Sequence, residues 1–265
     1  MKIKKYIVIG NPIEHSLSPK LHNFWLKKNG INAIYEKRKI QEFDIKSIIS
    51  DLKIGKINGV NVTVPFKNAV IPFMDQLSPE AIESQSVNTI CVENEKIIGH
   101  NTDIAGFELG LRHTKYDFKN KKVFILGAGG VVPSIILGLK KIGVADILLS
   151  NRTKEKANEL KKIFPHLKIV DWGKTPEFEV IINATSIGLK KDDLINLDYK
   201  NIGSKKFFYD IIYNPRETNF LKRGNELKNR TENGKMMFIY QAHQAFTIWH
   251  KIMPVIDDKT IELLD

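Results

Sequence analysis

The sequence predicts an α/β protein of two domains, the second of which binds a dinucleotide. Two observations carry this prediction. Short apolar segments alternate with segments of helical spacing along most of the 265 residues, which is typical of sheets covered by helices. In addition, a glycine-rich turn at 127–130 stands between a strand-like apolar run and a helix-like one. This order of strand, glycine turn and helix is the first unit of a dinucleotide-binding fold.

The composition fits a globular protein of a reducing compartment. Charged residues make up 27% and hydrophobic residues 42%, as in ordinary globular domains. No apolar run reaches the length of a membrane span, and no signal-peptide pattern opens the chain. The single cysteine, Cys91, forbids an internal disulfide. We therefore expect a cytoplasmic protein.

The net charge of +11 raises the question of nucleic-acid binding. The excess comes as scattered lysine pairs, and neither a zinc-finger spacing nor an aromatic–basic RNA motif accompanies it. The seven histidines show no metal-ligand spacing. We therefore expect small-molecule ligands, with no nucleic acid, membrane or metal partner. The oligomeric state is left open, with a homodimer as one alternative.

The first hundred residues predict a small α/β domain of their own. Strand-like and helix-like patterns alternate there and are separated by Gly, Pro and Asn. Strands are expected at 5–10, 33–39 and 57–64, helices at 18–29, 43–53 and over most of 66–86, and a hairpin with a four-residue turn at 87–99. A helix at 103–113 follows, and the domain boundary is placed at its start.

The first helix begins at a strong sequence signal. Ser18 precedes Pro19, and a serine N-cap with proline at the first helical position starts many helices. Capping accounts for Ser18 without any ligand, but it leaves Ser16 unexplained.

Two further segments combine polar residues in patterns that admit a functional interpretation. Asn61 and Thr63 face one side of a strand end, and Lys67 follows at the start of a helix. This arrangement is typical of a ligand-facing edge, although a solvated lysine is the plain alternative. Asp103 opens the helix at 103–113, where position alone favours a capping role.

The second domain is expected to continue the dinucleotide unit. Val132 stands where the motif has its third glycine, and Pro133 falls in the first helical turn, where a missing N–H costs nothing. Strands are expected at 123–126, 145–149, 168–170, 179–182 and 207–212, and helices at 131–142, 153–164 and 235–252. Ligands of open parallel sheets bind at the carboxyl ends of the strands. The loops at 183–188 and 213–215 should therefore border the cofactor, and the last helix is expected to return to the first domain.

The residues after the second strand of this unit predict NADP rather than NAD. An NAD site has an acidic residue there for the ribose 2′-hydroxyl, whereas an arginine accommodates a 2′-phosphate. Here the acid is absent and Arg152 and Thr153 are present. Arg152 can donate two N–H groups to phosphate oxygens, and Thr153 can both donate to the phosphate and cap the next helix.

Taken together, these segments resemble the shikimate dehydrogenase family. The motifs occur in the family's order at 10–19, 61–67, 87–89, 99–107, 127–130, 151–153, 183–188, 213–215 and 241–246. The resemblance implies NADPH-dependent, reversible reduction of 3-dehydroshikimate to shikimate, a step towards chorismate and the aromatic amino acids. It also implies an oxidoreductase that acts on a CH–OH group, with the substrate between two domains. These are a substrate-binding domain at 1–102, completed by 235–265, and a Rossmann-like NADP-binding domain at 103–234.

The resemblance further implies roles for individual residues. Lys67 and Asp103 match the catalytic pair. The positions that hold the substrate are matched by Ser16, Ser18, Thr63, Asn88, Tyr213 and Gln241. The cofactor contacts are matched by Gly127, Ala128, Gly129, Gly130, Val131, Asn151, Arg152, Thr153, Lys156, Ile211 and Gly234. Which member of the catalytic pair transfers the proton stays open, as do two alternatives: an NAD-dependent quinate/shikimate dehydrogenase and a non-catalytic relative.

Overall fold

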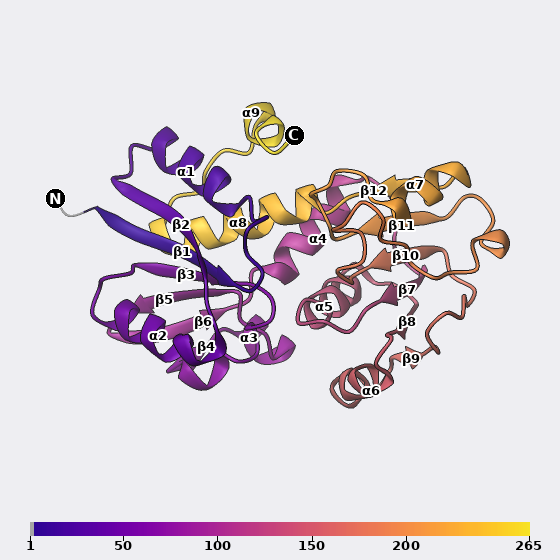
Figure 1. Cartoon of the computed structure of the whole chain (residues 1–265), viewed down its shortest axis with the longest axis horizontal. Coiled ribbons are helices and arrows are strands. Elements are labelled where there is room, and N and C mark those ends of the chain that lie inside the picture. The colour runs from indigo at the N-terminus through magenta and orange to yellow at the C-terminus, as the bar shows by residue number, and fades with distance from the viewer. Residues whose placement is uncertain (1–2) are drawn as a thin grey trace. The chain divides into compact units, whose positions relative to one another are not determined.

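The computed structural model describes residues 3–265, which form two compact units (Figure 1). Unit 1 comprises residues up to Gly106 together with Ile239–Asp265, and unit 2 comprises Phe107–Phe238. The division falls inside α4 (Asp103–His113) and α8 (Lys235–His250), so both helices contribute to both units. Within the described residues, no helix is long and apolar enough to cross a membrane.

Unit 1 contains a mixed six-stranded sheet in the order β2-β1-β3-β5-β6-β4. The strands are β1 (Lys4–Gly10), β2 (Ala33–Lys39), β3 (Gly59–Val62), β4 (Gln76–Leu77), β5 (Thr89–Glu93) and β6 (Lys96–His100). β1 pairs with β2 and β3 in parallel, whereas β5 and β6 form the predicted hairpin. Its turn is shorter than expected, because Asn94 and Glu95 both adopt positive φ, as tight hairpin turns require.

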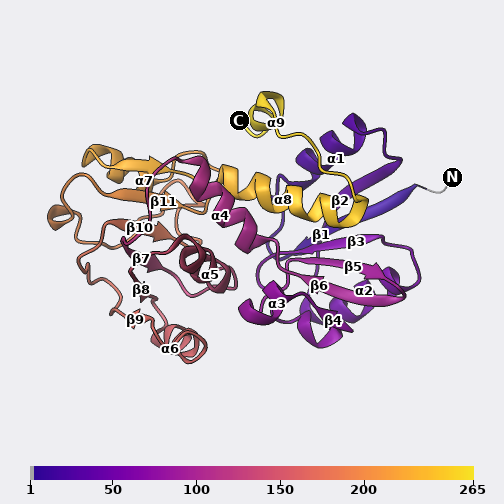
Figure 2. The same cartoon turned by 180° about the vertical axis from the view of Figure 1, so that it is seen from behind.

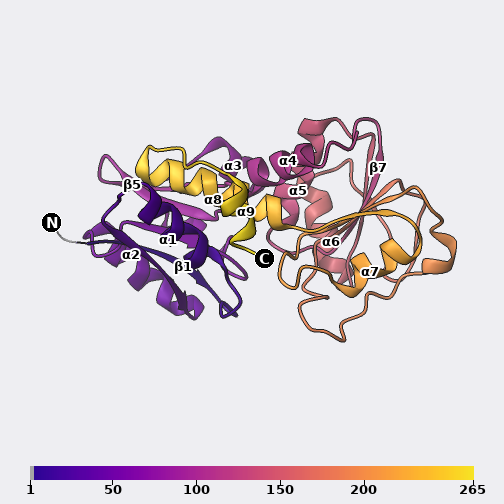
Figure 3. The same ribbon diagram turned by 90° about the horizontal axis from the view of Figure 1, so that it is seen from above.

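Helices cover both faces of this sheet. α2 (Ile45–Lys53) and α3 (Pro79–Ser84) lie on one side, and α1 (Ser18–Lys28) and the unit 1 part of α8 lie on the other (Figure 1). Figure 3 shows α1 beside α8, where Trp25 contacts both His243 and Phe246. Because β1 is buried on both faces, its successive side chains Tyr6 and Ile7 are both in the core.

Two expectations for unit 1 are wrong. The helix over most of 66–86 is replaced by turns, a 3-10 helix at Ile71–Phe73, β4 and the short α3, because prolines at 72 and 79 interrupt a continuous helix. Lys67 therefore lies among turns rather than at a helix start. Ser18 is also not the cap of α1: it is the first helical residue, and its own N–H is donated to Ser16 Oγ at 3.3 Å.

Unit 2 contains a six-stranded parallel sheet in the order β12-β11-β10-β7-β8-β9. The strands are β7 (Lys122–Leu126), β8 (Asp146–Ser150), β9 (Lys168–Ile169), β10 (Val180–Asn183), β11 (Phe207–Asp210) and β12 (Arg230–Glu232). This is the doubly wound Rossmann order, in which the chain changes direction across the sheet between β7 and β10. Ligands of such sheets bind at that switch point.

The helices of unit 2 cover both faces of its sheet. They are α5 (Val132–Ile142), α6 (Lys154–Ile163) and α7 (Asn219–Glu226), together with the later residues of α4. α4 and α5 lie side by side (Figure 2). Phe107 of α4 contacts Tyr209, and Phe220 of α7 contacts Phe208, so these two helices cover opposite faces of β11.

Several short elements have no counterpart in the sequence analysis. They are α7, β12, α9 (Asp258–Glu262) and a 3-10 helix at Tyr199–Asn201. The three residues of β12, Arg230–Glu232, carry no apolar pattern. Their place in the sheet follows from parallel pairing with β11, which no local signal announces.

Candidate active site and nucleotide-binding turn

Lys67 and Asp103 form a buried ion pair in unit 1. Lys67 Nζ lies 2.5 Å from Asp103 Oδ2, and the two residues are 7% and 5% exposed. The carbonyl oxygen of Lys67 accepts the N–H of Val87 at 2.9 Å, which ties the turns after β3 to the start of β5. The alternative of a solvated lysine is therefore wrong.

The ion pair keeps hydrogen-bonding capacity for a ligand. Within residues 3–265, Asp103 is the hydrogen-bonding partner of the Lys67 ammonium group, which carries three N–H donors. Asp103 uses Oδ2 for this contact, and Oδ1 has no partner among the same residues. A hydroxyl group of a ligand both donates and accepts. The pair can therefore accept the proton of a hydroxyl at Oδ1 and donate an N–H to its oxygen.

The capping role that position favoured for Asp103 is also wrong. Asp103 is the first residue of α4, and its carboxylate reaches Lys67. Asn101 Oδ1 instead accepts the N–H groups of Asp103 at 3.0 Å and Ile104 at 3.2 Å. The first turn of α4 thus has its acceptor from Asn101, and the carboxylate of Asp103 is left for other contacts.

Asn88 is held beside this pair by Thr102. Asn88 Oδ1 accepts the N–H of Thr102 at 2.8 Å, and Asn88 Nδ2 donates to Thr102 Oγ1 at 2.9 Å. An amide nitrogen carries two hydrogens, so one donor of Asn88 is left for a ligand. Asn61 of β3, in turn, donates to the carbonyl of Asn88 at 3.0 Å. The side chain of Asn61 is therefore committed to the protein.

Thr63 lies against Gly10, the last residue of β1, after which the loop with Ser16 and Ser18 begins. A side chain at Gly10 would place its Cβ 2.5 Å from Thr63 Cγ2, so glycine is required for the approach. Ser16 is half-buried, and Ser18 is 8% exposed. Ser16 and Ser18 thus follow the carboxyl end of β1, and Thr63 follows that of β3, its parallel neighbour in unit 1.

The remaining two substrate candidates lie at the other end of the sequence. Tyr213 belongs to unit 2, and its ring stacks on Phe238 at 4.3 Å between centroids. Gln241 is half-buried on the unit 1 part of α8. The candidate substrate residues thus come from both units, with Tyr213 as the contribution of unit 2.

The glycine turn joins β7 to α5 at the switch point of unit 2. Gly127 has φ +110°, and a Cβ there would lie 2.7 Å from the carbonyl oxygen of Ala184. Ala128 and Gly130 are half-buried, whereas Gly129 is exposed and has no atom within 4 Å of a Cβ position. Val131 occupies the N-cap of α5 without a side-chain hydrogen bond. The N–H of Val132 donates to the carbonyl of Gly129 at 2.9 Å and Pro133 has no N–H, so the start of α5 favours an anion through its dipole.

The residues after β8 form a basic surface. Arg152, Thr153 and Lys156 are exposed, and within the described residues neither Arg152 nor Lys156 has a carboxylate partner. The expected capping by the Thr153 side chain is wrong, because Thr153 makes no cap hydrogen bond. Asn151 Nδ2 instead donates to the carbonyl of Thr153 at 2.7 Å. Two unpaired cations and a free hydroxyl fit a phosphate group.

A buried carboxylate joins the two loops that follow β10 and β11. Asp210 Oδ2 accepts the hydroxyl of Thr218 at 2.6 Å, and its Oδ1 accepts from Asn183 Nδ2 at 3.1 Å and from the N–H of Ile212 at 3.0 Å. Burial raises the pKa of the Asp210 carboxyl to about 6. Beside it, Gly234 lies so close to Ile211 that a Cβ would come within 2.1 Å of the Ile211 oxygen.

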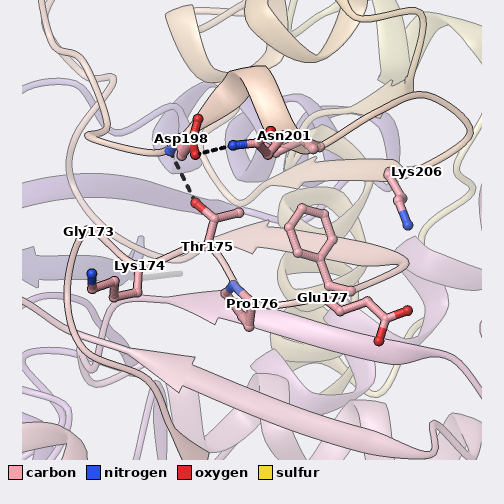
Figure 4. A pocket seen from close by; sticks show the side chains of 10 residues that line it. Gly173, Lys174, Thr175, Pro176, Glu177, Asp198, Asn201 and Lys206 are labelled. Atoms are coloured by element: carbon pink, nitrogen blue, oxygen red, sulfur yellow. Dashed lines mark hydrogen bonds between the residues drawn. The ribbon is translucent and has the colours of Figure 1, made fainter.

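Unit 2 also has a polar cavity of about 520 Å³ at the other end of its sheet (Figure 4). Its lining includes Lys174, Thr175 and Glu177, which precede β10, and Lys206, which precedes β11. Because β7, β10 and β11 are parallel, this cavity lies at the amino ends of the strands. The glycine turn lies at their carboxyl ends, so the cavity is not part of the nucleotide site.

Sequence reasoning missed three residues of these sites. Asn101 and Thr102 stand inside the quoted motif at 99–107 without an assigned role, and Asp210 ends a strand. An asparagine just before a helix is a recognised capping signal, so Asn101 could have been found. Thr102 and Asp210 carry no such local signal. Within the described residues, no group of three His, Cys, Asp or Glu side chains could hold a metal ion.

Family models match both units of the chain. The model for the shikimate dehydrogenase substrate binding domain matches residues 8–90, and the model for shikimate / quinate 5-dehydrogenase matches residues 108–227. The chain is also 60% identical over 262 residues to shikimate dehydrogenase (NADP(+)) of Pelagibacter ubique (strain HTCC1062), in a match that covers 99% of each protein.

Solved structures share the fold over the full length. The crystal structure of shikimate dehydrogenase from Aquifex aeolicus has a TM-score of 0.90 at 37% identity and covers 99% of this chain and 97% of that chain. The Thermus thermophilus enzyme in complex with NADP(H) and shikimate has a TM-score of 0.89 at 28% identity, with coverage of 99% and 98%.

Proposed function

The chain belongs to the shikimate dehydrogenase family, and from this premise we propose which of its residues carry out the reaction. The reaction is the reversible, NADP-dependent reduction of 3-dehydroshikimate to shikimate. It is a step of aromatic amino-acid biosynthesis. Bound NADPH supplies the hydride. The protein must supply a proton, because negative charge develops on the carbonyl oxygen as the hydride arrives.

Lys67 and Asp103 are the proposed proton-handling pair. The observation that carries this proposal is their 2.5 Å contact in a buried place, with ligand-binding capacity left on both groups. In the reduction, the Lys67 ammonium donates a proton to the carbonyl oxygen on which charge develops, and the Asp103 carboxylate orients the ammonium. In the reverse direction, the hydroxyl of shikimate returns its proton to the pair. Because the two groups are in direct contact, the proposal assigns proton transfer to the pair and not to one member.

The substrate is proposed to bind through residues of unit 1. Asn88 offers one free amide hydrogen, and Thr63 with the serine loop offers hydroxyl groups at the strand ends. The full proposed set is Ser16, Ser18, Thr63, Asn88 and Gln241, with Tyr213 added by unit 2. Hydroxyl and amide groups suit a ring that carries hydroxyls and a carboxylate, because each can pair with both.

NADP is proposed to bind unit 2 at the switch point. The exposed Gly129 and the positive dipole end of α5 suit the pyrophosphate, and Arg152, Thr153 and Lys156 suit the 2′-phosphate. The remaining proposed contacts are Gly127, Ala128, Gly130, Val131, Asn151, Ile211 and Gly234. Unit 1 is thus assigned to the substrate and unit 2 to the cofactor. A cytoplasmic location is proposed as well, since the single thiol of Cys91 fits a reducing compartment.

Lys67→Met tests the proposed pair in the purified full-length protein. NADPH formed from shikimate is followed by absorbance, and kcat should fall about 10²- to 10⁴-fold, while KM for NADP should stay near its original value because the nucleotide turn belongs to unit 2. Lys5→Met is the matched control, since Lys5 pairs with Glu36 at 3.0 Å on the surface of unit 1.

Removing one member of a buried ion pair also destabilises a protein, so a second variant is needed. Lys67→Met combined with Asp103→Asn removes both charges and should restore much of the lost stability without restoring kcat. A kcat within about two-fold of the original in the single variant would show that the pair does not handle the proton.

A further inference from the structure

Asn101 connects the start of α4 to the end of α3. The residue is 5% exposed, and its amide makes contacts in two directions. Oδ1 accepts the N–H groups of Asp103 at 3.0 Å and Ile104 at 3.2 Å. Nδ2 donates to Ser84 Oγ at 2.9 Å and to the carbonyl of Ser86 at 3.0 Å.

Ser84, at the α3 end of this connection, is held in place by its own helix. Ser84 is fully buried and is the last residue of α3. Its hydroxyl donates to the carbonyl of Glu80 at 2.6 Å, one helical turn earlier. Asn101 therefore transmits the position of α3 to the backbone of Asp103, while Asn88 holds the intervening residue Thr102 from the other side.

The position of the Asp103 backbone determines where the carboxylate of the ion pair lies. A carboxylate on aspartate is separated from Cα by one methylene group, so its position follows the backbone closely. The Lys67 ammonium sits on a flexible four-carbon stem and can follow its partner. We propose that Asn101 is a positioning residue, which acts through the Asp103 backbone to aim the carboxylate at Lys67. This inference rests on the proposed role of the pair.

Asn101→Ala removes both sets of contacts. The expected result is a fall in kcat of about 10- to 100-fold, since a misplacement of about 1 Å can cost that much. The pH profile of kcat should shift, because the contact between the two proton-handling groups is altered. KM for NADP should stay within about two-fold, as the nucleotide turn lies in unit 2.

Asp257→Ala is the matched control for lost capping. Asp257 caps α9 in unit 1 by accepting the N–H of Thr260 at 3.0 Å, and it has no contact with the pair. Its variant should lower the urea midpoint of unfolding while kcat and the pH profile stay unchanged. Asn101→Ser serves if the alanine variant does not fold, because serine keeps a helix acceptor but cannot reach α3; an intermediate loss of kcat is expected.

A mutant cycle with Asp103→Asn separates this inference from the proposed function. If Asn101 acts through Asp103, the double variant Asn101→Ala/Asp103→Asn should be no slower than Asp103→Asn alone. If the losses of kcat in the two single variants multiply in the double variant, the positioning role is overturned. It is also overturned if Asn101→Ala keeps the original kcat and pH profile while Asp103→Asn is slow. If Asp103→Asn itself keeps the original kcat, the proposed function of the pair fails instead.

Discussion

At the scale of single residues, an exposed cation without an ion-pair partner is a better candidate for phosphate binding than one whose charge is already paired. Lys154 is exposed but lies 2.7 Å from Asp171, so its charge is already balanced. Arg152 and Lys156 are equally exposed and have no such partner among residues 3–265. Cations at the first turn of a helix oppose its dipole. An anion from outside the protein would relieve this unfavourable arrangement.

Arg152→Ala should weaken NADP while leaving NAD almost unaffected. Charge-assisted hydrogen bonds to the 2′-phosphate are worth about 1.5–3 kcal/mol, or about 10- to 150-fold in affinity, and NAD lacks this group. KM for both cofactors is measured at saturating shikimate. Lys154→Ala is the matched control and should change neither value. Equal losses with NADP and NAD would assign Arg152 to a general role.

At the scale of elements, Gly127 and Gly129 in the turn between β7 and α5 are glycines for different reasons. Gly127 is needed by the protein itself, because its positive φ and the nearby Ala184 carbonyl exclude a side chain. Gly129 has open space around its Cβ position. The fold therefore does not require a glycine at 129. The close approach of a cofactor phosphate to the protein backbone would require one.

Gly129→Ala should leave stability unchanged and weaken both nucleotides. The added methyl meets no protein atom but would stand where the pyrophosphate approaches α5. KM for NADP and for NAD should rise together, unlike the selective effect at Arg152, and the urea midpoint should stay the same. Gly127→Ala is the contrasting variant, with an expected loss of stability. An unchanged KM in Gly129→Ala would move the pyrophosphate away from this turn.

At the scale of the whole molecule, acid should destabilise unit 1 through its buried histidines. His22 stacks on Tyr35 at 4.2 Å between centroids, and neither ring nitrogen has a hydrogen-bonding partner within the described residues. Burial lowers the pKa of His22 to about 3 and that of His250 to about 4. Below pH 6.5 the unfolded chain binds protons that the folded chain does not. The contribution of these two uncharged histidines to the free energy of unfolding is complete above pH 6.5 and is lost as the pH falls.

The pKa of Asp210 acts in the opposite sense. Burial raises it to about 6, so the folded chain holds a proton that the unfolded chain has already released between about pH 4 and 6. This contribution to stability is complete at low pH and is lost as the pH rises through 6. Because the two contributions oppose each other, the histidine effect is best isolated by a variant.

His22→Phe should flatten the acid side of the stability profile. Phenylalanine keeps the stacking on Tyr35 and removes the group that takes up a proton on unfolding. The free energy of unfolding of the original protein should fall by about 2 kcal/mol more than that of the variant between pH 7 and 5, as measured by urea titration. The exposed His166→Phe is the control and should keep the original slope. Parallel profiles for His22→Phe and the original protein would contradict the assignment.

The sequence by itself determined the features that depend on neighbouring residues. The alternation of strands and helices, the glycine turn and the basic segment after β8 are all local patterns, and their chemistry follows from residue type and spacing. The resemblance added the family and its reaction. Where local signals conflicted, as with the two prolines in the predicted helix at 66–86, the local prediction failed.

Tertiary structure alone decided which polar residues meet. Lys67 and Asp103 are 36 residues apart, and neither position shows locally that the other lies 2.5 Å away. The same folding brought Asn101 against Ser84, 17 residues earlier in the sequence. A buried charge needs a partner. Lys67 and Asp103 therefore form an ion pair, although each position taken alone suggests a solvated lysine and a helix cap. That contact depends on the packing of β3, β5 and α4, which no local pattern contains.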